Sequence, residues 1–580
     1  MARMLLSSNA IFAFLPLAAA LLGSGAPDAE TAAAAWQRMQ AALAGTPEAG
    51  PAPEVAAASA ILRLDGRVLG HGAALSTTDR SCIDAAIAEA IASAQKDGEW
   101  LAWVARPATL AEAVTLELEL GGEPEPLTGR TLTDCAQSLR PALDAMAVRR
   151  GTTMHWMPVS RLQSMGLAAR PNDGLGLLMR RAGLADTDLP SIDPAESVAI
   201  YRVPTIRLAQ SAPRAAPWLI LHGERLVPAS AVTHDACIAA AERAAAWLEG
   251  CVLDEPGSPA PVLLGDYGTI ADRRQPMVAG TIDRLMAAWA FAELAARPGD
   301  RAPSWRARAA VLAGQANDAD LDPLTVRRAL ALRTIAWCAL TRSGSDDERQ
   351  AARTEVNSLA ARLAASVLEE APADPVRALE LAAAACVTLS GARVLEPAAL
   401  HGAIARAWDE LPRASLVTEA EWLLRAAAWS DLAPPPAPLV QDALRDVLMR
   451  VQLGIGSATK ELPSDLVGAF QLAAANGQPS IGATGLRPLA ALVRMAASTA
   501  DPGTRQRLDE ACRAGARFVL QLQVSTDGAT LLRQPRRCVG GLRESMWEPR
   551  IRVAGTAAAI LVLLDVAQTL PAAGNLPNPS

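Results

Sequence analysis

Aromatic side chains are scarce in this sequence, as are the short motifs by which many enzymes are recognised. Phenylalanine, tryptophan and tyrosine make up 3% of the 580 residues, and 13 of them are tryptophan. An aromatic-lined pocket of the kind that stabilises carbocations is therefore not expected. The sequence contains no P-loop, GxSxG, HExxH or dinucleotide fingerprint, so the usual sequence support for those enzyme classes is missing.

An overall excess of positive charge is also missing. Lysine and arginine total 54 against 61 aspartates and glutamates, a formal net charge of -7, so nucleic acid is not expected as a partner. The eight cysteines show no CxxC or Cys/His spacing, so we expect neither a metal site nor a cofactor. Buried free thiols are expected at Cys237, Cys338 and Cys386, while a bridge between Cys237 and its neighbour Cys251 stays open.

Long apolar runs are missing beyond the N-terminus. Residues 1–26 combine one arginine, an apolar run from Ile11 to Leu22, and small residues at Ser24 and Ala26. This pattern predicts a secretory signal peptide, because the run is short for a bilayer span; the alternative is an uncleaved anchor. No later run is long enough to span a membrane, so we expect an exported, periplasmic or extracellular protein without a transmembrane segment in the mature chain.

The sequence is rich in alanine and leucine, and its length exceeds that of a single hydrophobic core. After the signal we predict a helix and a Pro/Gly linker in 27–58, an α+β domain in 59–209 and a linker in 210–217. A helical domain in 218–572 and a tail in 573–580 follow. The predicted fold is mainly α, with the N-terminal α+β domain followed by an α/α toroid or a helical-hairpin array.

Period-two patterns predict strands in 59–209. The stretch "AILRLDGRVLGHGAAL" alternates around an Asp-Gly turn, which is typical of a hairpin. "AVTLELEL" alternates strictly and predicts a half-buried strand, and "ESVAIYRVPTIRLA" predicts another strand. "SCIDAAIAEAIASAQKD" repeats isoleucine at a spacing of four, which predicts a helix with one apolar face.

Helical patterns fill 218–572. About eleven helices separated by Pro/Gly loops are predicted, a density typical of a hairpin array or a closed toroid. In one of them Ile282, Leu285, Met286 and Trp289 share a face, so Trp289 is predicted to be a core residue.

The order of the N-terminal patterns resembles that of the AMME chromosomal region protein family (an AMMECR-like domain). The resemblance is carried, in order, by "AAIAEAIASAQKD", "VTLELEL" with "GGEPEPL", "GTTMHWMPVSRL", "LMRRAGL" and "VAIYRVP". The family's Leu-Arg-Gly-Cys-Ile-Gly turn corresponds to Val68–Ala73, which lacks both the arginine and the cysteine. His71 in this stretch is either a ligand or general base, or a turn residue at the surface.

The helical region resembles the α/α toroids of terpenoid cyclases, prenyltransferases and six-hairpin glycan enzymes. The resemblance is carried by "GDYGTIADRRQPMVAGTIDRLMAAWAFAELA", "IGATGLRPLAALV" and "RFVLQLQVSTDG". The last is similar to a cyclase repeat, with Ala529-Thr530 where a tryptophan is expected, and the cyclase Asp-x-Asp-Asp motif is absent. The resemblance implies that loops at one end of the ring present carboxylates, histidines and aromatics to a central cavity.

The candidate site residues are the polar groups that this implied cavity would contain. Asp266, Asp283 and Glu544 are the candidate catalytic acids and bases if the chain is an enzyme. Arginine binds carboxylate or phosphate and aromatic rings stack on sugars, so the candidate ligand-binding residues are Tyr267, Arg284, Arg543, Trp547, Arg550 and Arg552, together with His71 of the other domain. Alternatively, the arginines pair with Glu544, Glu548 and nearby carboxylates and close the ring.

Two functions are compatible with the sequence. The first is an exported noncatalytic scaffold or binding protein with a degenerate toroid cavity, whose partner is an acidic glycan, another anionic ligand or a protein. The second is an extracytoplasmic polysaccharide-acting toroid enzyme, a lyase, epimerase or hydrolase, with carboxylate acid/base groups and an arginine clamp. An open cavity between Asp266 or Asp283 and Glu544 would favour the enzyme. The sequence favours the scaffold, because no ionisable residue directly follows Arg552.

Overall fold

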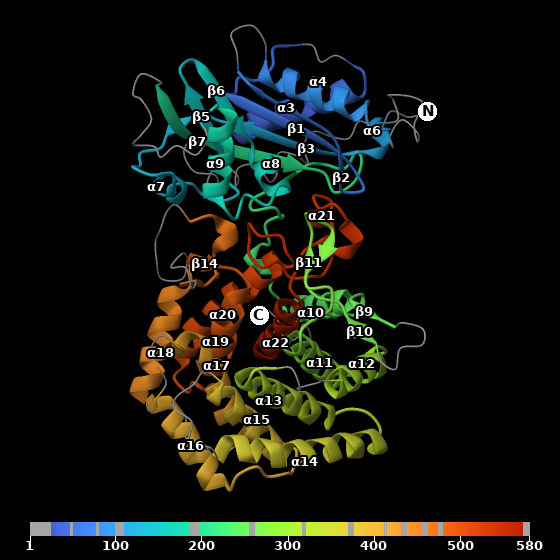
Figure 1. Cartoon of the computed structure of the whole chain (residues 1–580), viewed down its shortest axis with the longest axis vertical. Coiled ribbons are helices and arrows are strands. Elements are labelled where there is room, and N and C mark those ends of the chain that lie inside the picture. Colours follow the sequence, from blue (N-terminus) through green and yellow to red (C-terminus); the bar gives the residue numbers. More distant parts are fainter. Residues whose placement is uncertain are drawn as a thin grey trace, which may run out of the picture.

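The computed structural model is mainly helical, with a sheet-containing N-terminal part and a helical C-terminal part, as predicted (Figure 1). Apart from Gly25 and Ala26, the predicted signal segment lies outside the described residues, and so does the predicted tail. The described residues are 25–46, 50–76, 81–98, 110–184, 197–254, 261–315, 321–368, 376–410, 412, 415–430, 438–454, 462–473 and 479–571.

The N-terminal part is built on an eight-stranded sheet whose described pairings are all antiparallel. The strand order is β2-β1-β3-β7-β5-β6, and β4 and β8 pair with β7. β1 and β2 form the predicted hairpin. The strands are β1 (Ala57–Leu64), β2 (Arg67–Leu75), β3 (Thr115–Gly121), β4 (Glu125–Pro126), β5 (Asp144–Arg150), β6 (Thr153–Met157), β7 (Val198–Ala209) and β8 (Trp218–Leu219).

One face of this sheet is apolar and the other carries charges. The leucines of β3 pack in a core with α3 (Ala29–Leu43) and α4 (Cys82–Ala94). Glu117 and Glu119 occupy the alternate positions of the strand, yet they are only 1% and 0% exposed. The alternation correctly predicts a strand, but the prediction that it is half-buried is wrong. The polar face of β3 packs against α8 (Val159–Ser164), and part of it lines a pocket.

Two glycines allow α4 to lie directly on β2. A Cβ atom at Gly70 would lie 2.1 Å from the carbonyl oxygen of Ala90, and one at Gly72 would lie 2.0 Å from that of Ala86. His71 points to the opposite face of the sheet, where its Nε2 lies 3.1 Å from Ser59 Oγ. The expectation of a turn histidine at the surface is therefore wrong. His71 is a half-buried strand residue, and burial lowers the pKa of its imidazole.

The helical part closes into a ring, with six inner helices among the described residues. α11 packs on α13, α13 on α15, α15 on α17, α17 on α19, α19 on α22, and α22 again on α11. An outer helix packs against each inner one, which makes the ring an α/α toroid (Figure 1). The inner helices are α11 (Thr281–Ala295), α13 (Pro323–Leu340), α15 (Arg377–Leu389), α17 (Leu416–Ser430), α19 (Leu486–Ser498) and α22 (Val553–Thr569). The outer helices are α10 (His234–Glu249), α12 (Ala302–Gly314), α14 (Asp346–Leu368), α16 (Pro397–Glu410), α18 (Pro438–Val451) and α20 (Pro502–Leu522).

One of these helices, α12, is not predicted by its sequence pattern. Its sequence "APSWRARAAVLAG" places Arg306 among the buried positions beside Trp305, so the apolar stripe that identifies a helix is interrupted. With α12 included, every inner helix of the described ring has an outer neighbour.

Charged and aromatic side chains fill the middle of the ring. Arg425 of α17 is 2% exposed, and it donates hydrogen bonds to Glu421 and to Asp565 of α22. Arg494 of α19 donates to the same Asp565 at 2.6 Å. Trp289 of α11 is a core residue, as predicted, and the guanidinium carbon of Arg425 lies 5.1 Å from its ring centroid. Protein side chains therefore occupy the centre where α11, α17, α19 and α22 meet.

All eight cysteines are buried free thiols, including Cys237, Cys338 and Cys386 as predicted, and Cys251 is not bridged to Cys237. Within the described ranges, no helix has both the length and the apolar character needed to cross a membrane. Within the same ranges, no cluster of histidine, cysteine, aspartate and glutamate is arranged to hold a metal ion.

Candidate functional site between the sheet and the ring

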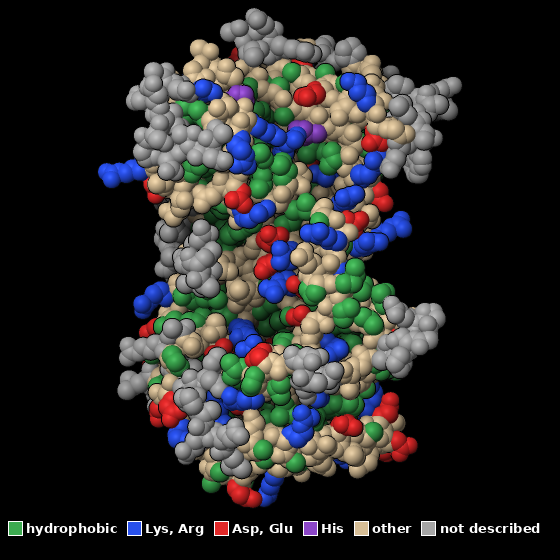
Figure 2. Space-filling model, in the orientation of Figure 1, with side chains coloured by type: hydrophobic (Ala, Val, Ile, Leu, Met, Phe, Trp, Pro, Cys, Tyr) green, Lys and Arg blue, Asp and Glu red, His purple; other side chains and the backbone are tan. Residues whose placement is uncertain are grey.

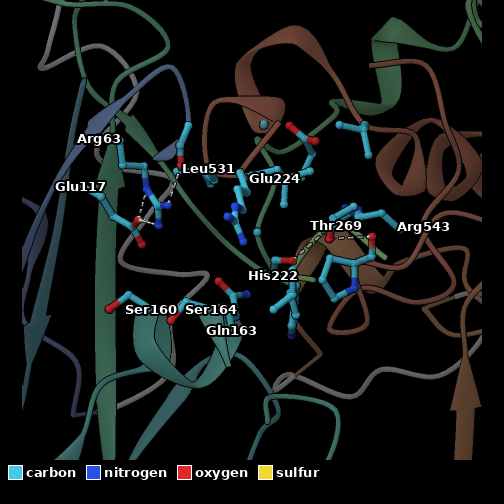
Figure 3. Close-up of a pocket in the computed structure, with 18 of the residues that line it drawn as sticks. Arg63, Glu117, Ser160, Gln163, Ser164, His222, Glu224, Thr269, Leu531 and Arg543 are labelled. Atoms are coloured by element: carbon cyan, nitrogen blue, oxygen red, sulfur yellow. Dashed lines mark hydrogen bonds and ion pairs between the residues drawn. The ribbon is translucent and has the colours of Figure 1, made fainter. Parts of the chain in front are cut away.

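A pocket of about 300 Å³ lies between the sheet and the ring. The sheet side is formed by the β1–β2 hairpin, β3, β7 and α8, and the ring side by residues 222–224, 269–270 and 524–549. In Figure 3, Arg63, Glu117 and Ser160 lie on one side of the cavity and His222, Thr269 and Arg543 on the other. Figure 2 shows arginines and carboxylates gathering at the narrowing between the two parts.

Buried ion pairs form the sheet wall of this pocket. Glu117 of β3 accepts a hydrogen bond from Arg63 Nη2 of β1 at 2.7 Å and another from Arg207 Nη2 of β7 at 2.7 Å. Burial by itself would raise the pKa of Glu117, but the two guanidinium groups lower it to about 2. One ionised carboxylate is thus shared by two arginines.

Glu119, the next inward-facing residue of β3, holds α8 in place. Its Oε1 accepts the backbone N–H of Val159 at 2.7 Å and its Oε2 accepts that of Ser160 at 2.8 Å. Burial raises the pKa of Glu119, and Arg207 Nε lies 3.8 Å from Oε2 without forming a hydrogen bond. Glu119 therefore orients the face of α8 that lines the pocket and satisfies none of the donors of Arg207.

Arg207 has more donors than acceptors to bind them. Its side chain is 3% exposed and lines the pocket, and its Nε and Nη1 have no hydrogen-bond partner among the described residues. Ser160 Oγ lines the same wall and is buried beside Glu119. A buried unsatisfied donor costs roughly 1–3 kcal/mol, and more when it is charged. The sheet wall therefore lacks a hydrogen-bond acceptor.

A histidine–aspartate pair belongs to the ring wall. Asp465 Oδ2 lies 2.7 Å from His222 Nδ1 and accepts the backbone N–H of His222 at 3.3 Å. Burial alone would raise the pKa of Asp465, but His222 lowers it. Trp547 packs edge-on against the imidazole, with ring centroids 5.9 Å apart. The other ring nitrogen, Nε2, has no partner among the described residues, and His222 lines the pocket.

Two other charged residues of the ring wall are bound by the protein itself. Glu224 accepts a hydrogen bond from Ser525 Oγ at 2.6 Å, and burial raises the pKa of its carboxyl group. Arg543 donates to the carbonyl oxygens of Gln521 at 2.8 Å and of His222 at 3.0 Å. Burial lowers the pKa of Arg543. These contacts fix the 222–224 segment against the end of α20.

The predicted catalytic carboxylates do not line this pocket. Arg552 Nε lies 3.3 Å from Asp266 Oδ2, and its Nη1 lies 3.3 Å from Glu544 Oε1. Burial raises the pKa of Asp283, and the nearby Asp266 raises it further. Asp266 and Glu544 thus share one guanidinium group at the N-terminal ends of α11 and α22.

Of the predicted ligand-binding residues, Arg543 and Trp547 line the pocket. The others contact protein groups, and among them only Arg550 and Arg552 form the arginine–carboxylate pairs of the alternative in which the arginines close the ring. The contacts join Tyr267 to Asp272 at 2.7 Å, Arg284 to Thr281 at 3.3 Å, Arg550 to Glu544 at 3.9 Å, Arg552 to Asp266 at 3.3 Å and His71 to Ser59 at 3.1 Å.

Sequence analysis missed Arg207, Ser160, His222 and Asp465. A signal for the first was present, because three predicted strands carry a charged residue among apolar neighbours, namely Arg63, Glu117 and Arg207. His222 and Asp465 are 243 positions apart, so no local pattern connects them.

No family model matches the chain, and no curated protein matches it. Among solved structures, an uncharacterized protein from Pyrococcus horikoshii matches with 17% sequence identity and a TM-score of 0.24. The match covers 33% of this chain and 95% of that one. At such a score the similarity carries no argument about fold or function.

Proposed function

We propose that this chain is an exported binding protein with a noncatalytic toroid, and that its pocket between the sheet and the ring takes a small anionic ligand. The export part of the proposal rests on the N-terminal sequence, and the sheet part is proposed to be AMMECR-like on its order of patterns. The observation that carries the binding proposal is the buried guanidinium of Arg207, with donors that no described residue accepts.

A carboxylate or phosphate group is the ligand chemistry that suits this wall. Arg63 and Arg207 carry two positive charges beside Glu117, which they keep ionised, and beside Glu119, whose pKa is raised by burial. An anion would accept from Arg207 and from the hydroxyl of Ser160, and such charge-assisted hydrogen bonds are about twice as strong as neutral ones. The cavity of about 300 Å³ is at the small end of ligand pockets, so the ligand is the size of one sugar acid or a short dicarboxylate.

Two observations favour binding over the polysaccharide-acting toroid enzyme. Asp266 and Glu544 both form ion pairs with Arg552, as expected if these charged residues hold the ring closed. In the middle of the ring, Arg425 contacts both Asp565 and Trp289, so these polar and aromatic groups are engaged with one another.

Calorimetric titration tests the proposal, with D-galacturonate, glutarate and inorganic phosphate as probes. We expect at least one probe to bind, and Arg207→Gln to weaken its binding about 10- to 100-fold, because a charged hydrogen bond contributes about 1.5–3 kcal/mol. Arg214→Gln is the matched control, since that side chain is 67% exposed and pairs with Glu112 on the surface. Failure of all three probes to bind, or equal binding by Arg207→Gln, would overturn the proposal.

A further inference from the structure

We propose that the same pocket also hydrolyses an ester of its anionic ligand, with His222 as the general base. This step rests on the proposed function, because Arg207 is the group that anchors the substrate. It adds a reaction to that binding site and keeps its ligand chemistry.

His222 has the geometry that a general base requires. Asp465, 0% exposed, lies 2.7 Å from Nδ1 and fixes the ring. Asp465 Oδ2 is the acceptor beside Nδ1, so a neutral imidazole carries its proton on Nδ1 and its lone pair on Nε2. Since Nε2 has no partner among the described residues, it is available to a molecule in the cavity.

Water is the nucleophile in this arrangement. No hydrogen bond joins Ser160 Oγ to His222 among the described residues, so His222 does not activate this hydroxyl. A water molecule beside Nε2 meets the requirement that a general base lies within hydrogen-bond reach of the proton it takes.

Gln163 is placed to stabilise the negative charge that develops on the ester oxygen. It lines the pocket from α8, and its Nε2 lies 3.4 Å from the point where a Cβ atom of Gly223 would be. No described residue accepts from this amide. The amide N–H of Gln163 therefore lies next to Gly223, the residue after His222. An oxyanion formed at this place would be stabilised by a preorganised donor.

The reaction balances without a further reagent. His222 Nε2 takes a proton from water as the water oxygen forms a bond to the ester carbonyl carbon. The tetrahedral intermediate then breaks its bond to the alcohol oxygen, and the departing alkoxide takes the proton back from His222. The products are the free acid and the alcohol.

The two walls define the class of substrate. In this arrangement Arg207 and Ser160 bind an acid group on the sheet side, His222 and Gln163 meet the ester, and the rest of the lining includes apolar side chains. The lining includes Ile270, Leu531, Met546 and Trp547. We therefore infer a monoester of a short dicarboxylic acid, in which methylene groups separate the acid from the ester.

Release of 4-nitrophenolate from mono-4-nitrophenyl glutarate tests the inference, with 4-nitrophenyl acetate as the substrate that lacks the acid group. We expect the glutarate ester to be preferred, and His222→Gln to lower kcat about 100-fold with little change in KM, as removal of a general base does. Arg207→Gln should raise KM instead. Asp465→Asn, which changes a positioning residue, should lower kcat and displace the pH–rate profile.

Glutarate titration of the same variants separates the two proposals. Binding of glutarate without cleavage of its ester, or unchanged cleavage by both His222→Gln and Asp465→Asn, overturns the hydrolysis and leaves the binding function standing. If glutarate, galacturonate and phosphate all fail to bind the wild type, the binding function is overturned as well.

Discussion

Single residues of the sheet wall show why charge is kept inside this protein. Glu117 is buried, and on desolvation grounds alone its carboxyl group would be neutral. Arg63 and Arg207 on the two flanking strands keep it ionised, and in return it is the acceptor that both arginines need. Removing one member of such a set costs more than the set contributes, because it leaves a buried charge uncompensated.

Glu117→Gln is therefore expected to destabilise the fold in a pH-dependent way. The pKa of Glu117 is lowered from 4.5 to about 2, so its contribution is complete above pH 4.5 and is lost as the pH falls towards 2. The contribution near neutral pH is about 3 kcal/mol by linkage. Urea unfolding at several pH values should show a gap between wild type and variant that narrows below about pH 4. A gap that stays constant down to pH 2 would contradict the assignment.

Residue identity in the strands was predictable, but the surroundings of the charges were not. Alternation in "VTLELEL" predicts which side chains share a face, and the structure agrees. Whether that face meets water depends on what packs over it, and α8 and the ring come from distant parts of the chain. Arg543 was selected because arginine binds anions, yet its donors are taken by carbonyl groups that no local pattern reveals.

The close distance between α4 and β2 depends on two glycines of the strand. α4 lies on β2 because Gly70 and Gly72 present no side chain to it. This is a packing role, and it explains the Gly-His-Gly sequence without any chemistry at His71.

Gly70→Ala should therefore reduce stability by about 1–3 kcal/mol, the usual cost of forcing an extra group into a packed interface. The new Cβ would lie 2.1 Å from a backbone oxygen of α4, which can yield only if the helix moves. Gly98→Ala is the control, because no atom of the described residues lies within 4 Å of its Cβ position. Denaturant midpoints measure both. Equal midpoints for the two variants would show that α4 has room to shift.

Helices were predictable where apolar spacing was regular and were missed where it was broken. The eleven predicted helices match α10, α11, α13 to α20 and α22. The segment of α12 contains Arg306 at a buried position, where it donates to the carbonyl of Leu340. Whether an arginine can be buried between helices depends on the group that accepts its hydrogen bonds, and for Arg306 that group belongs to α13.

The whole molecule forms its pocket only while the sheet and the ring stay docked. Trp547 packs against the core of the ring and also against the core beside β5 and β6. The β1–β2 turn meets the loop before η8 (Pro535–Arg537), where a Cβ at Gly66 would lie 1.9 Å from the carbonyl oxygen of Leu532. The sequence correctly predicts a sheet-containing part and a helical part. It does not predict that their surfaces fit together, because the pattern within one part carries no information about the other.

Gly66→Ala tests whether docking and ligand binding are one property. The substitution adds two costs, a side chain at φ +80° and a collision with the backbone of the ring part. Gly151→Ala carries a comparable strain at φ +57° in the β5–β6 turn, but within the part of the chain that the structure describes no atom lies within 4 Å of its Cβ position, so it isolates the first cost. We expect Gly66→Ala to weaken binding of the probe identified by titration, because both walls must approach to bind it, whereas Gly151→Ala should bind it as the wild type does.

Scanning calorimetry should show the unfolding of Gly66→Ala broadened or divided into two transitions, since the sheet no longer shares the cooperativity of the ring. Equal affinity and equal transitions for the two glycine variants would mean that the hairpin tip is dispensable for docking.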